Sequence, residues 1–166
     1  MALPSFDKAN DDRKAKQDWP AAKGIQDFII FEGWCVGSQP VSAKELDEPI
    51  NSLEENEDPQ AIWRRAVNKY LSEDYQQLFA LHDVLIFLKA PDFEAILNWR
   101  GEQEQKLRHK TPDRDTYIIA SDDIRGFVQH FERITRGNLI NLPKHANHIF
   151  EFDREHQITS RIDKKP

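Results

Sequence analysis

Three short apolar runs, each bounded by charged or polar residues, predict buried β-strands at 27–32, 83–89 and 148–153. The first two are almost continuously apolar, as expected for strands of a parallel sheet that helices cover on both faces. The third alternates apolar and polar residues more regularly, which is typical of a strand at the edge of a sheet. The pattern therefore predicts a small, mostly parallel sheet.

Helical periodicity fills the stretches between these runs. The spacing predicts a helix over 58–81, where Pro59 suits a first turn, a second over 91–109, and a third that Ser121 caps and that ends near Gly137. The apolar stripe of the first helix consists of Ile62, Ala66, Tyr70 and Leu71. Strands that alternate with helices indicate an α/β fold with right-handed crossovers.

Two polar segments fall outside this alternation. Residues 1–24 have no periodicity and predict an exposed loop or arm. Residues 38–58 carry seven acidic residues from Glu45 to Asp58, and predict a surface excursion with one short helix. The length of 166 residues suits one domain, so we expect residues 1–166 to form a single unit.

Composition narrows the class of protein. With 39% hydrophobic and 31% charged residues, the chain suits a globular protein with a packed core. No apolar run approaches the roughly 18 residues of a membrane span, and the first residues lack a signal-peptide pattern. Cys35 is the only cysteine, which excludes an internal disulfide and multi-cysteine metal sites. These features lead us to expect a cytoplasmic protein with no membrane partner.

Charge is uneven along the chain. The net charge of -6 disfavours a nucleic-acid partner. Residues 1–83 carry 9 basic and 16 acidic groups, whereas residues 84–166 carry 14 and 13. An anionic ligand is therefore expected nearer the second half, although solvated faces also produce such differences.

Glu32 is the first candidate for chemistry, because it ends the first predicted strand just before Gly33. The carboxyl ends of parallel strands are the edge where open α/β sheets bind ligands. A carboxylate there can orient a metal-bound water or accept a proton. The alternative is a solvated acid before a turn.

The helix over 91–109 supplies the second candidates. Its apolar stripe becomes polar halfway, which predicts that Arg100 and Arg108 leave the core and face a cleft. Guanidinium groups there can hold phosphate oxygens. The alternative is a helix end in water, with Glu104 and Arg108 as an ordinary i,i+4 pair.

The N-terminal charge cluster is the third candidate. Asp7, Lys8, Asp12 and Arg13 can bind a hydroxylated anion, or they belong to a solvated loop.

Together these places form an ordered set of motifs: Leu-Pro-Ser-Phe-Asp-Lys-Ala-Asn-Asp-Asp-Arg (3–13), Asp-Trp-Pro (18–20), Phe-Glu-Gly-Trp-Cys-Val-Gly (31–37) and Trp-Arg-Gly-Glu-Gln-Glu-Gln-Lys-Leu-Arg (99–108). In this order they resemble the D-glycerate 3-kinase-like group of P-loop kinases, relatives of uridine kinase, phosphoribulokinase and pantothenate kinase. The resemblance covers essentially the whole chain. It implies a three-layer α/β fold and phosphoryl transfer from ATP, with Mg²⁺, to a small hydroxy acid.

The resemblance also implies roles for individual residues. Catalytic residues would be Glu32, which would also serve the metal, and Asp12; substrate-binding residues would be Asp7, Lys8, Arg13 and Trp34; lid residues over the phosphates would be Arg100 and Arg108; and residues bordering the adenine would be Asn141 and Pro143. Residues 1–24 would then be the substrate-loop arm.

One motif of such kinases is absent from these 166 residues. No G-x-x-x-x-G-K-[ST] stretch, which cradles phosphates, occurs; Lys110-Thr111 is preceded by His109 and has no glycine at the required distance. We therefore expect a partial P-loop fold that lacks the N-terminal P-loop strand and helix, which leaves strand edges unpaired.

The sequence thus favours a kinase-like chain that is inactive without a segment that supplies the P-loop, as a truncated or split enzyme. The alternatives are a non-catalytic binding or regulatory module and a gene remnant. Unpaired edges predict self-association or a partner segment.

Overall fold

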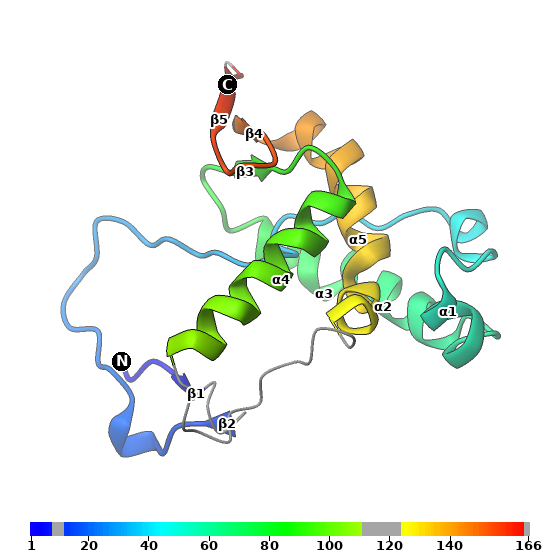
Figure 1. Ribbon diagram of the computed structural model, residues 1–166. Coiled ribbons are helices and arrows are strands. Elements are labelled where there is room, and N and C mark those ends of the chain that lie inside the picture. Colours follow the sequence, from blue (N-terminus) through cyan, green and yellow to red (C-terminus); the bar gives the residue numbers. More distant parts are fainter. Residues whose placement is uncertain (8–11, 111–123, 165–166) are drawn as a thin grey trace.

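The computed structural model describes residues 1–7, 12–110 and 124–164, and the side chains of all of these except 107–110 (Figure 1). The helices are α1 (Ser52–Glu57), α2 (Ile62–Ser72), α3 (Asp74–Phe79), α4 (Phe93–Lys110) and α5 (Ile124–His145), with short 3₁₀ helices at Lys16–Asp18 and Ala43–Leu46. The strands are β1 (Phe6–Asp7), β2 (Asp12–Arg13), β3 (Ile86–Lys89), β4 (His148–Phe152) and β5 (Ile158–Asp163).

The main sheet has three strands in the order β3-β4-β5. β3 and β4 are parallel, as the sequence predicted, with Phe87 opposite Ile149. β4 and β5 are antiparallel and form a hairpin, with Phe150 opposite Arg161. The sheet is therefore mixed, and β5 was not predicted, because Ile158–Asp163 alternates only weakly between apolar and polar residues.

The core lies between α4 and α5. Phe93 of α4 packs with Ile124 and Val128 of α5, and Leu97 and Phe127 complete the cluster. Val128 is fully buried. α5 also contacts β3, so α5 connects the core to the sheet. None of the helices in the described ranges is apolar enough over a sufficient length to cross a bilayer.

The first predicted strand is wrong. Residues 27–32 run without a strand partner among the described residues, and Phe28, Ile29 and Ile30 are 89%, 85% and 91% exposed. The continuous apolar pattern is that of a strand covered on both faces, but within the described chain no neighbouring strand meets it.

Two predicted helices also differ from the structure. The helix predicted over 58–81 is divided into α2 and α3, because the backbone at Glu73 leaves the helical region (φ -112°, ψ -92°). α5 continues beyond Gly137 to His145 and includes Pro143. Burial of Asn138 and Leu142 along the same face holds the helix past the glycine. The cap predicted at Ser121 lies outside the described residues.

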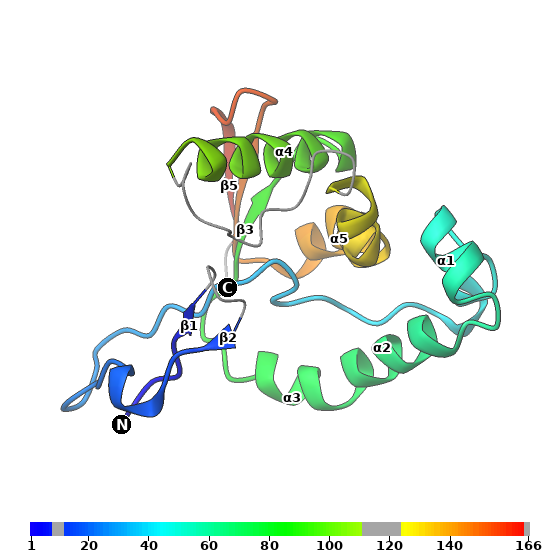
Figure 2. The same cartoon turned by 60° about the horizontal axis from the view of Figure 1, so that its bottom comes forward.

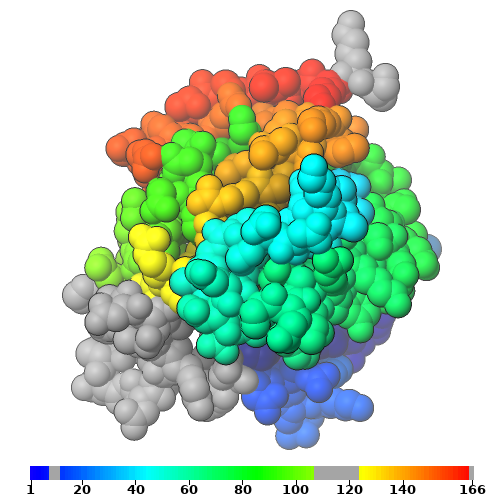
Figure 3. Space-filling view, turned by 90° about the vertical axis from the view of Figure 1, so that its right-hand side faces the viewer, coloured from blue at the N-terminus to red at the C-terminus, as the bar shows by residue number. Residues whose placement is uncertain are grey.

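The two polar segments are more ordered than the sequence indicates. Within residues 1–24, β1 and β2 form an antiparallel ribbon that pairs Asp7 with Asp12, and Figure 2 shows it apart from the main sheet. Residues 38–58 contain two short helices instead of one and lie against α5 (Figure 3).

Arg133 of α5 holds that acidic segment. Its guanidinium donates to the Glu54 carboxylate (2.8 and 2.5 Å) and to the carbonyl oxygens of Glu45 (2.5 Å) and Glu48 (2.8 Å). Burial raises the pKa of Glu54, but the hydrogen bonds from Arg133 and from the Ile50 N–H lower it by more. The net pKa therefore lies below its usual value. The acidic excursion is thus attached to the fold by charge.

Candidate functional site

α4 carries the middle of the candidate site. The helix begins after Asp92, whose carboxylate accepts a hydrogen bond from the Ala95 N–H at 2.8 Å, as a capping residue does. Its first turns bury Phe93 and Ala95, and the same face then becomes polar. Through this change Arg100 lines a cleft, while only 22% of its side chain is exposed.

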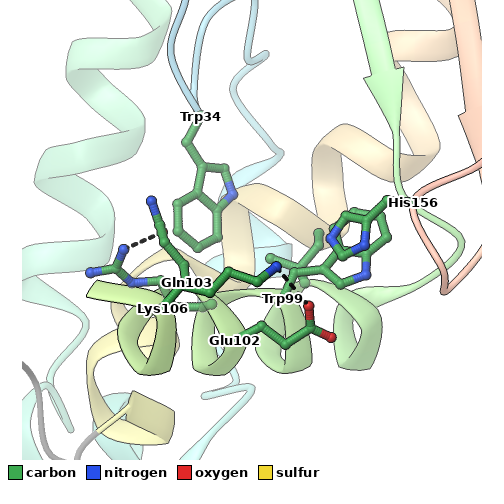
Figure 4. A pocket seen from close by; sticks show the side chains of 8 residues that line it. Trp34, Trp99, Glu102, Gln103, Lys106 and His156 are labelled. Carbon is green, nitrogen blue, oxygen red and sulfur yellow. Dashed lines mark hydrogen bonds and ion pairs between the residues drawn. The ribbon is translucent and has the colours of Figure 1, made fainter. Parts of the chain in front are cut away.

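The cleft has a volume of about 580 Å³, and Figure 4 shows the side chains that line it. Its lining combines aromatic and charged side chains: Trp34, Ile96, Trp99, Arg100, Glu102, Gln103, Lys106 and His156. Ligand pockets typically measure about 300–1,000 Å³ and combine apolar walls with a few polar groups. We call this the α4 cleft.

Trp34 forms one wall of the α4 cleft and is fixed from behind by α5. Its indole stacks on Phe131, with ring centroids 4.8 Å apart and an angle of 13° between the planes. Its Nε1 donates to Thr135 Oγ1 at 2.9 Å. Thr135 in turn donates to the Phe131 carbonyl at 2.7 Å. The loop that follows Gly33 therefore presents Trp34 in a defined orientation.

Trp99 lies at the other end of the α4 cleft and is fixed by the β4–β5 hairpin. Its ring stacks on His156 with centroids 4.5 Å apart, and it meets Phe152 edge-on. Its Nε1 donates to the Arg154 carbonyl at 2.9 Å. His156 adopts a positive φ of 63° at the hairpin turn, which aims its imidazole at α4.

Arg100 is held by its own helix. Its guanidinium pairs with the Glu104 carboxylate, donates to Gln103 Oε1 at 2.5 Å, and lies 5.2 Å from the ring centre of Phe127. The Glu104 side chain is 95% buried, since only 5% of it is exposed. Arg100 Nε and Glu104 Oε2 are buried without a hydrogen-bond partner, so part of the polar capacity of this pair is unused.

A second charged pair on α4 is long and exposed to solvent. Lys106 Nζ lies 3.5 Å from a Glu102 carboxylate oxygen, and 73% and 49% of these side chains are exposed. An exposed pair of this kind contributes little stability, so the ammonium group can turn to another anion.

The predicted N-terminal residues do not line the α4 cleft. Asp12 and Arg13 are exposed on β2, where the Asp12 carboxylate accepts from the Arg13 N–H at 2.6 Å. Asp7 is partly buried on β1. Lys8 lies outside the described residues. Of the predicted substrate residues, only Trp34 reaches the cleft in the described chain.

Glu32 is exposed and also stays outside the cleft lining, two residues before Trp34. Glu32 is therefore not brought to the cleft that Arg100 lines, and residues 27–32 are not fixed in a strand. The side chain of Arg108 lies outside the described side chains. Within the described part, no group of three or more His, Cys, Asp or Glu side chains could hold a metal ion.

Asn141 and Pro143 lie near the end of α5, at a different hollow. Asn141 lines a second cleft of about 410 Å³ with Gln39, Pro40, Val41, Ser42, Glu45, Lys144 and His145. Asn141 Oδ1 accepts from Lys144 Nζ at 2.9 Å, and the Pro143 carbonyl accepts from Lys164 Nζ. The role of these residues beside adenine stays a prediction.

Several cleft residues were not singled out from the sequence. Gln103 follows from the polar half of the α4 stripe, so helical periodicity could have found it. Trp99 stood inside a quoted motif. His156 could not be found by pattern, because the hairpin that carries it was not predicted.

Comparison with solved structures identifies the class of fold. The structure of D-glycerate 3-kinase from Cryptococcus neoformans superimposes with a TM-score of 0.77 over 99% of this chain and 59% of that one, at 19% sequence identity. The fold is therefore the α/β fold of this kinase class, which confirms the predicted fold class. At this identity the likeness concerns the fold alone.

Sequence comparison gives the particular relatives. The chain is 28% identical over 137 residues to the uncharacterized kinase mug58 of Schizosaccharomyces pombe, a match that covers 79% of this chain and 47% of that protein. It is 28% identical over 136 residues to chloroplastic D-glycerate 3-kinase of Arabidopsis thaliana, with 79% of this chain and 26% of that protein covered. No model of a known protein family matches.

The chain is thus similar to D-glycerate 3-kinase and to a second kinase, as its motifs predicted. It spans less than half the length of these curated relatives. The partial coverage agrees with the prediction that the resemblance concerns one part of the kinase fold.

Proposed function

We propose that the chain is part of an ATP-dependent phosphotransferase that acts on glycerate or a similar small hydroxy acid. The observation that carries this proposal is the 28% identity to two kinases over 79% of the chain. In the reaction, an alcohol oxygen of the acceptor bonds to the terminal phosphorus of ATP, the bond from that phosphorus to the ADP oxygen breaks, and the alcohol proton passes to a base. Glu32 or Asp12 is the base in this proposal.

The arrangement on α4 supports a role in holding anions. Arg100 lines the cleft and keeps a fixed orientation through Gln103 and Glu104, so its N–H groups are presented without a large loss of side-chain freedom. Phosphoryl transfer depends mainly on positioning and charge stabilisation. Arg100 therefore serves as a lid residue, with Arg108 as its partner, and Asp7, Lys8, Arg13 and Trp34 serve the acceptor.

The residues present do not by themselves fit ATP and Mg²⁺. The 166 residues contain no G-x-x-x-x-G-K-[ST] motif, and no cluster of metal-binding side chains occurs in the described ranges. We therefore route no step through the metal. Nucleotide binding is assigned to a P-loop segment, on the same polypeptide or on a separate one, with Asn141 and Pro143 beside the adenine.

The exposed apolar edge is where this segment would bind. In addition to residues 28–31, the exposed apolar residues include Val84, Ile86 and Leu88, in and just before β3, which are 55%, 55% and 64% exposed. Among the strands in the described ranges, β3 pairs with β4 on one side and has no partner on the other. An unpaired apolar strand edge recruits another strand, which also makes self-association the expected fate of the chain alone.

A non-catalytic binding or regulatory module is the second candidate. The missing phosphate-binding motif favours it, because most of the charge stabilisation in phosphoryl transfer comes from that motif. Either protein would act in the cytoplasm, which the single cysteine supports, without a nucleic-acid or membrane partner.

The test is phosphoryl transfer from ATP to glycerate by the 166-residue chain, alone and co-expressed with the P-loop half of a D-glycerate 3-kinase. We expect no turnover alone and turnover with the segment, which Glu32→Gln or Asp12→Asn reduces at least about 100-fold if that residue is the base. A folded complex of the two segments that transfers no phosphate would exclude the kinase and favour the binding module.

A further inference from the structure

The α4 cleft offers a ligand two indole rings whose N–H groups are both occupied. Trp34 Nε1 is occupied by Thr135, and Trp99 Nε1 by the Arg154 carbonyl. Each indole therefore meets a ligand only with its ring. Rigid aromatic rings of this kind bind flat or apolar groups by stacking.

Both rings are held before any ligand arrives. Phe131 covers one face of Trp34, while 38% of the residue remains exposed. His156 covers one face of Trp99. Because neither indole must be ordered on binding, little side-chain entropy is lost, which favours affinity.

A polar group lies between the two rings. Figure 4 shows the Lys106 side chain extending along α4 between Trp34 and Trp99, with Gln103 at the Trp34 end. Lys106 is the mobile cation here, because its contact with Glu102 is long and exposed. Arg100 already bonds Gln103 and the buried Glu104 carboxylate, so Lys106 is the cation that is available to a ligand between the rings.

From this arrangement we infer that the α4 cleft binds an aromatic hydroxy acid, with its ring stacked on Trp34 or Trp99 and its carboxylate held by Lys106. A three-carbon acid such as glycerate leaves both rings unused and fills a small part of the roughly 580 Å³. The inference rests on the proposed function in calling this ligand the phosphate acceptor. Binding itself requires neither ATP nor the P-loop segment.

The test compares two ligands that differ in one ring. Phenyllactate and lactate are titrated into the 166-residue chain by calorimetry, with glycerate as a third ligand. We expect phenyllactate to bind at least about tenfold more tightly than lactate or glycerate, a difference typical of one stacked ring. Equal affinities, or no binding of phenyllactate to folded chain, would overturn the inference.

Variants locate the binding. Trp34→Leu and Lys106→Gln are each expected to weaken phenyllactate binding about tenfold. Their controls, Trp63→Leu and Lys69→Gln, alter exposed residues of α2 outside the cleft and should leave the affinity unchanged. Lys106 is exposed, so its variant keeps the test valid if Trp34→Leu unfolds. Affinity that both cleft variants leave unchanged would contradict the assignment.

The two proposals fail separately. Phenyllactate binding without phosphoryl transfer in the two-segment complex would retain the cleft and reject the kinase. Transfer to glycerate, with no binding of phenyllactate, would retain the kinase and reject the aromatic acceptor.

Discussion

Arginine side chains hold the acidic segment in place. How much each contributes to stability depends on how deeply it is buried. Arg64 is buried, with only 4% of its side chain exposed, and donates to the carbonyls of Leu46 (2.7 Å) and Asp58 (2.5 Å) as well as to the Asp58 carboxylate (3.3 Å). Its neighbour Arg65 makes a 2.7 Å ion pair with Asp47 that is about half exposed. The two residues are adjacent but stand in different dielectric surroundings.

We expect Arg64→Ala to lower the free energy of unfolding by about 3 kcal/mol, because it leaves buried acceptors and the Asp58 carboxylate without their partner. Arg65→Ala is the matched control and should cost at most about 1 kcal/mol, as exposed pairs do. Urea unfolding of both variants measures the difference. Equal losses would show that burial does not set the strength of these contacts.

The carboxylate of Asp58 makes the stability of the fold depend on pH. It accepts from the N–H groups of Trp63 and Arg64, both at 3.0 Å, at the start of α2. Burial alone raises the pKa of Asp58, but these backbone hydrogen bonds, one from Ile62 and the charge of Arg64 lower it more, so the net pKa is below its usual value.

A lowered pKa in the folded state means that Asp58 stabilises the fold above its unfolded pKa of about 4, and that this stability is lost as the pH falls through the folded pKa. We therefore expect Asp58→Asn to lower the Tm at pH 7 and to have a smaller effect near pH 3. Thermal melts of both proteins across this range measure it. A constant difference in Tm would contradict the assigned cause.

Among the elements, the loop between residue 32 and the 3₁₀ helix Ala43–Leu46 connects the cleft to the core. Trp34 is bound to Thr135, and buried Ser38 accepts a hydrogen bond from Asn138 at 2.9 Å, so the loop follows α5. Between them Gly37 has a φ of +80°, and a Cβ there would lie 3.1 Å from both Cδ atoms of Leu85.

Gly37→Ala should therefore lower the free energy of unfolding by about 2 kcal/mol, from left-handed backbone and crowding together. Gly24→Ala has a similar φ of +76° but nothing within 4 Å, so it should lose at most about 1 kcal/mol. Chemical denaturation compares them. A Gly37 variant no less stable than the Gly24 variant would mean that the loop is not packed against Leu85.

Elements whose own pattern of apolar and polar residues indicates their structure were predicted from the sequence. α4 was expected over 91–109 and runs Phe93–Lys110, because its apolar and polar positions follow one helical face. β3 and β4 and their parallel pairing were expected as well. The strand expected at 27–32 was wrong, because an apolar run indicates burial but does not supply the neighbour that buries it.

The candidate site was predicted in part for a similar reason. Helical periodicity brings Arg100 to the cleft, and the glycine-rich turn after Glu32 brings Trp34 there. His156 depends on a hairpin whose pairing is non-local and whose sequence pattern is weak. The network under the acidic segment depends on Arg64 and Arg133, which pair across up to 88 residues and leave no local pattern.

At the scale of the molecule, an apolar surface stays exposed because no described residue covers it. Phe28, Ile29 and Ile30 are almost fully exposed, and Ile86 and Leu88 of β3 more than half. The similar D-glycerate 3-kinase structure contains 41% of its length beyond the matched part, since 59% is covered. We assign this surface to a P-loop segment that pairs with these edges.

Hydrogen exchange tests this assignment most directly. Amide exchange is measured across 27–32 and 84–89 in the 166-residue chain, alone and with the P-loop half of a D-glycerate 3-kinase added. We expect fast exchange at 27–32 in the isolated chain and strong protection of both segments in the complex, because backbone N–H groups become paired. Protection of 27–32 in the isolated monomer, or a complex in which both segments still exchange freely, would contradict the account.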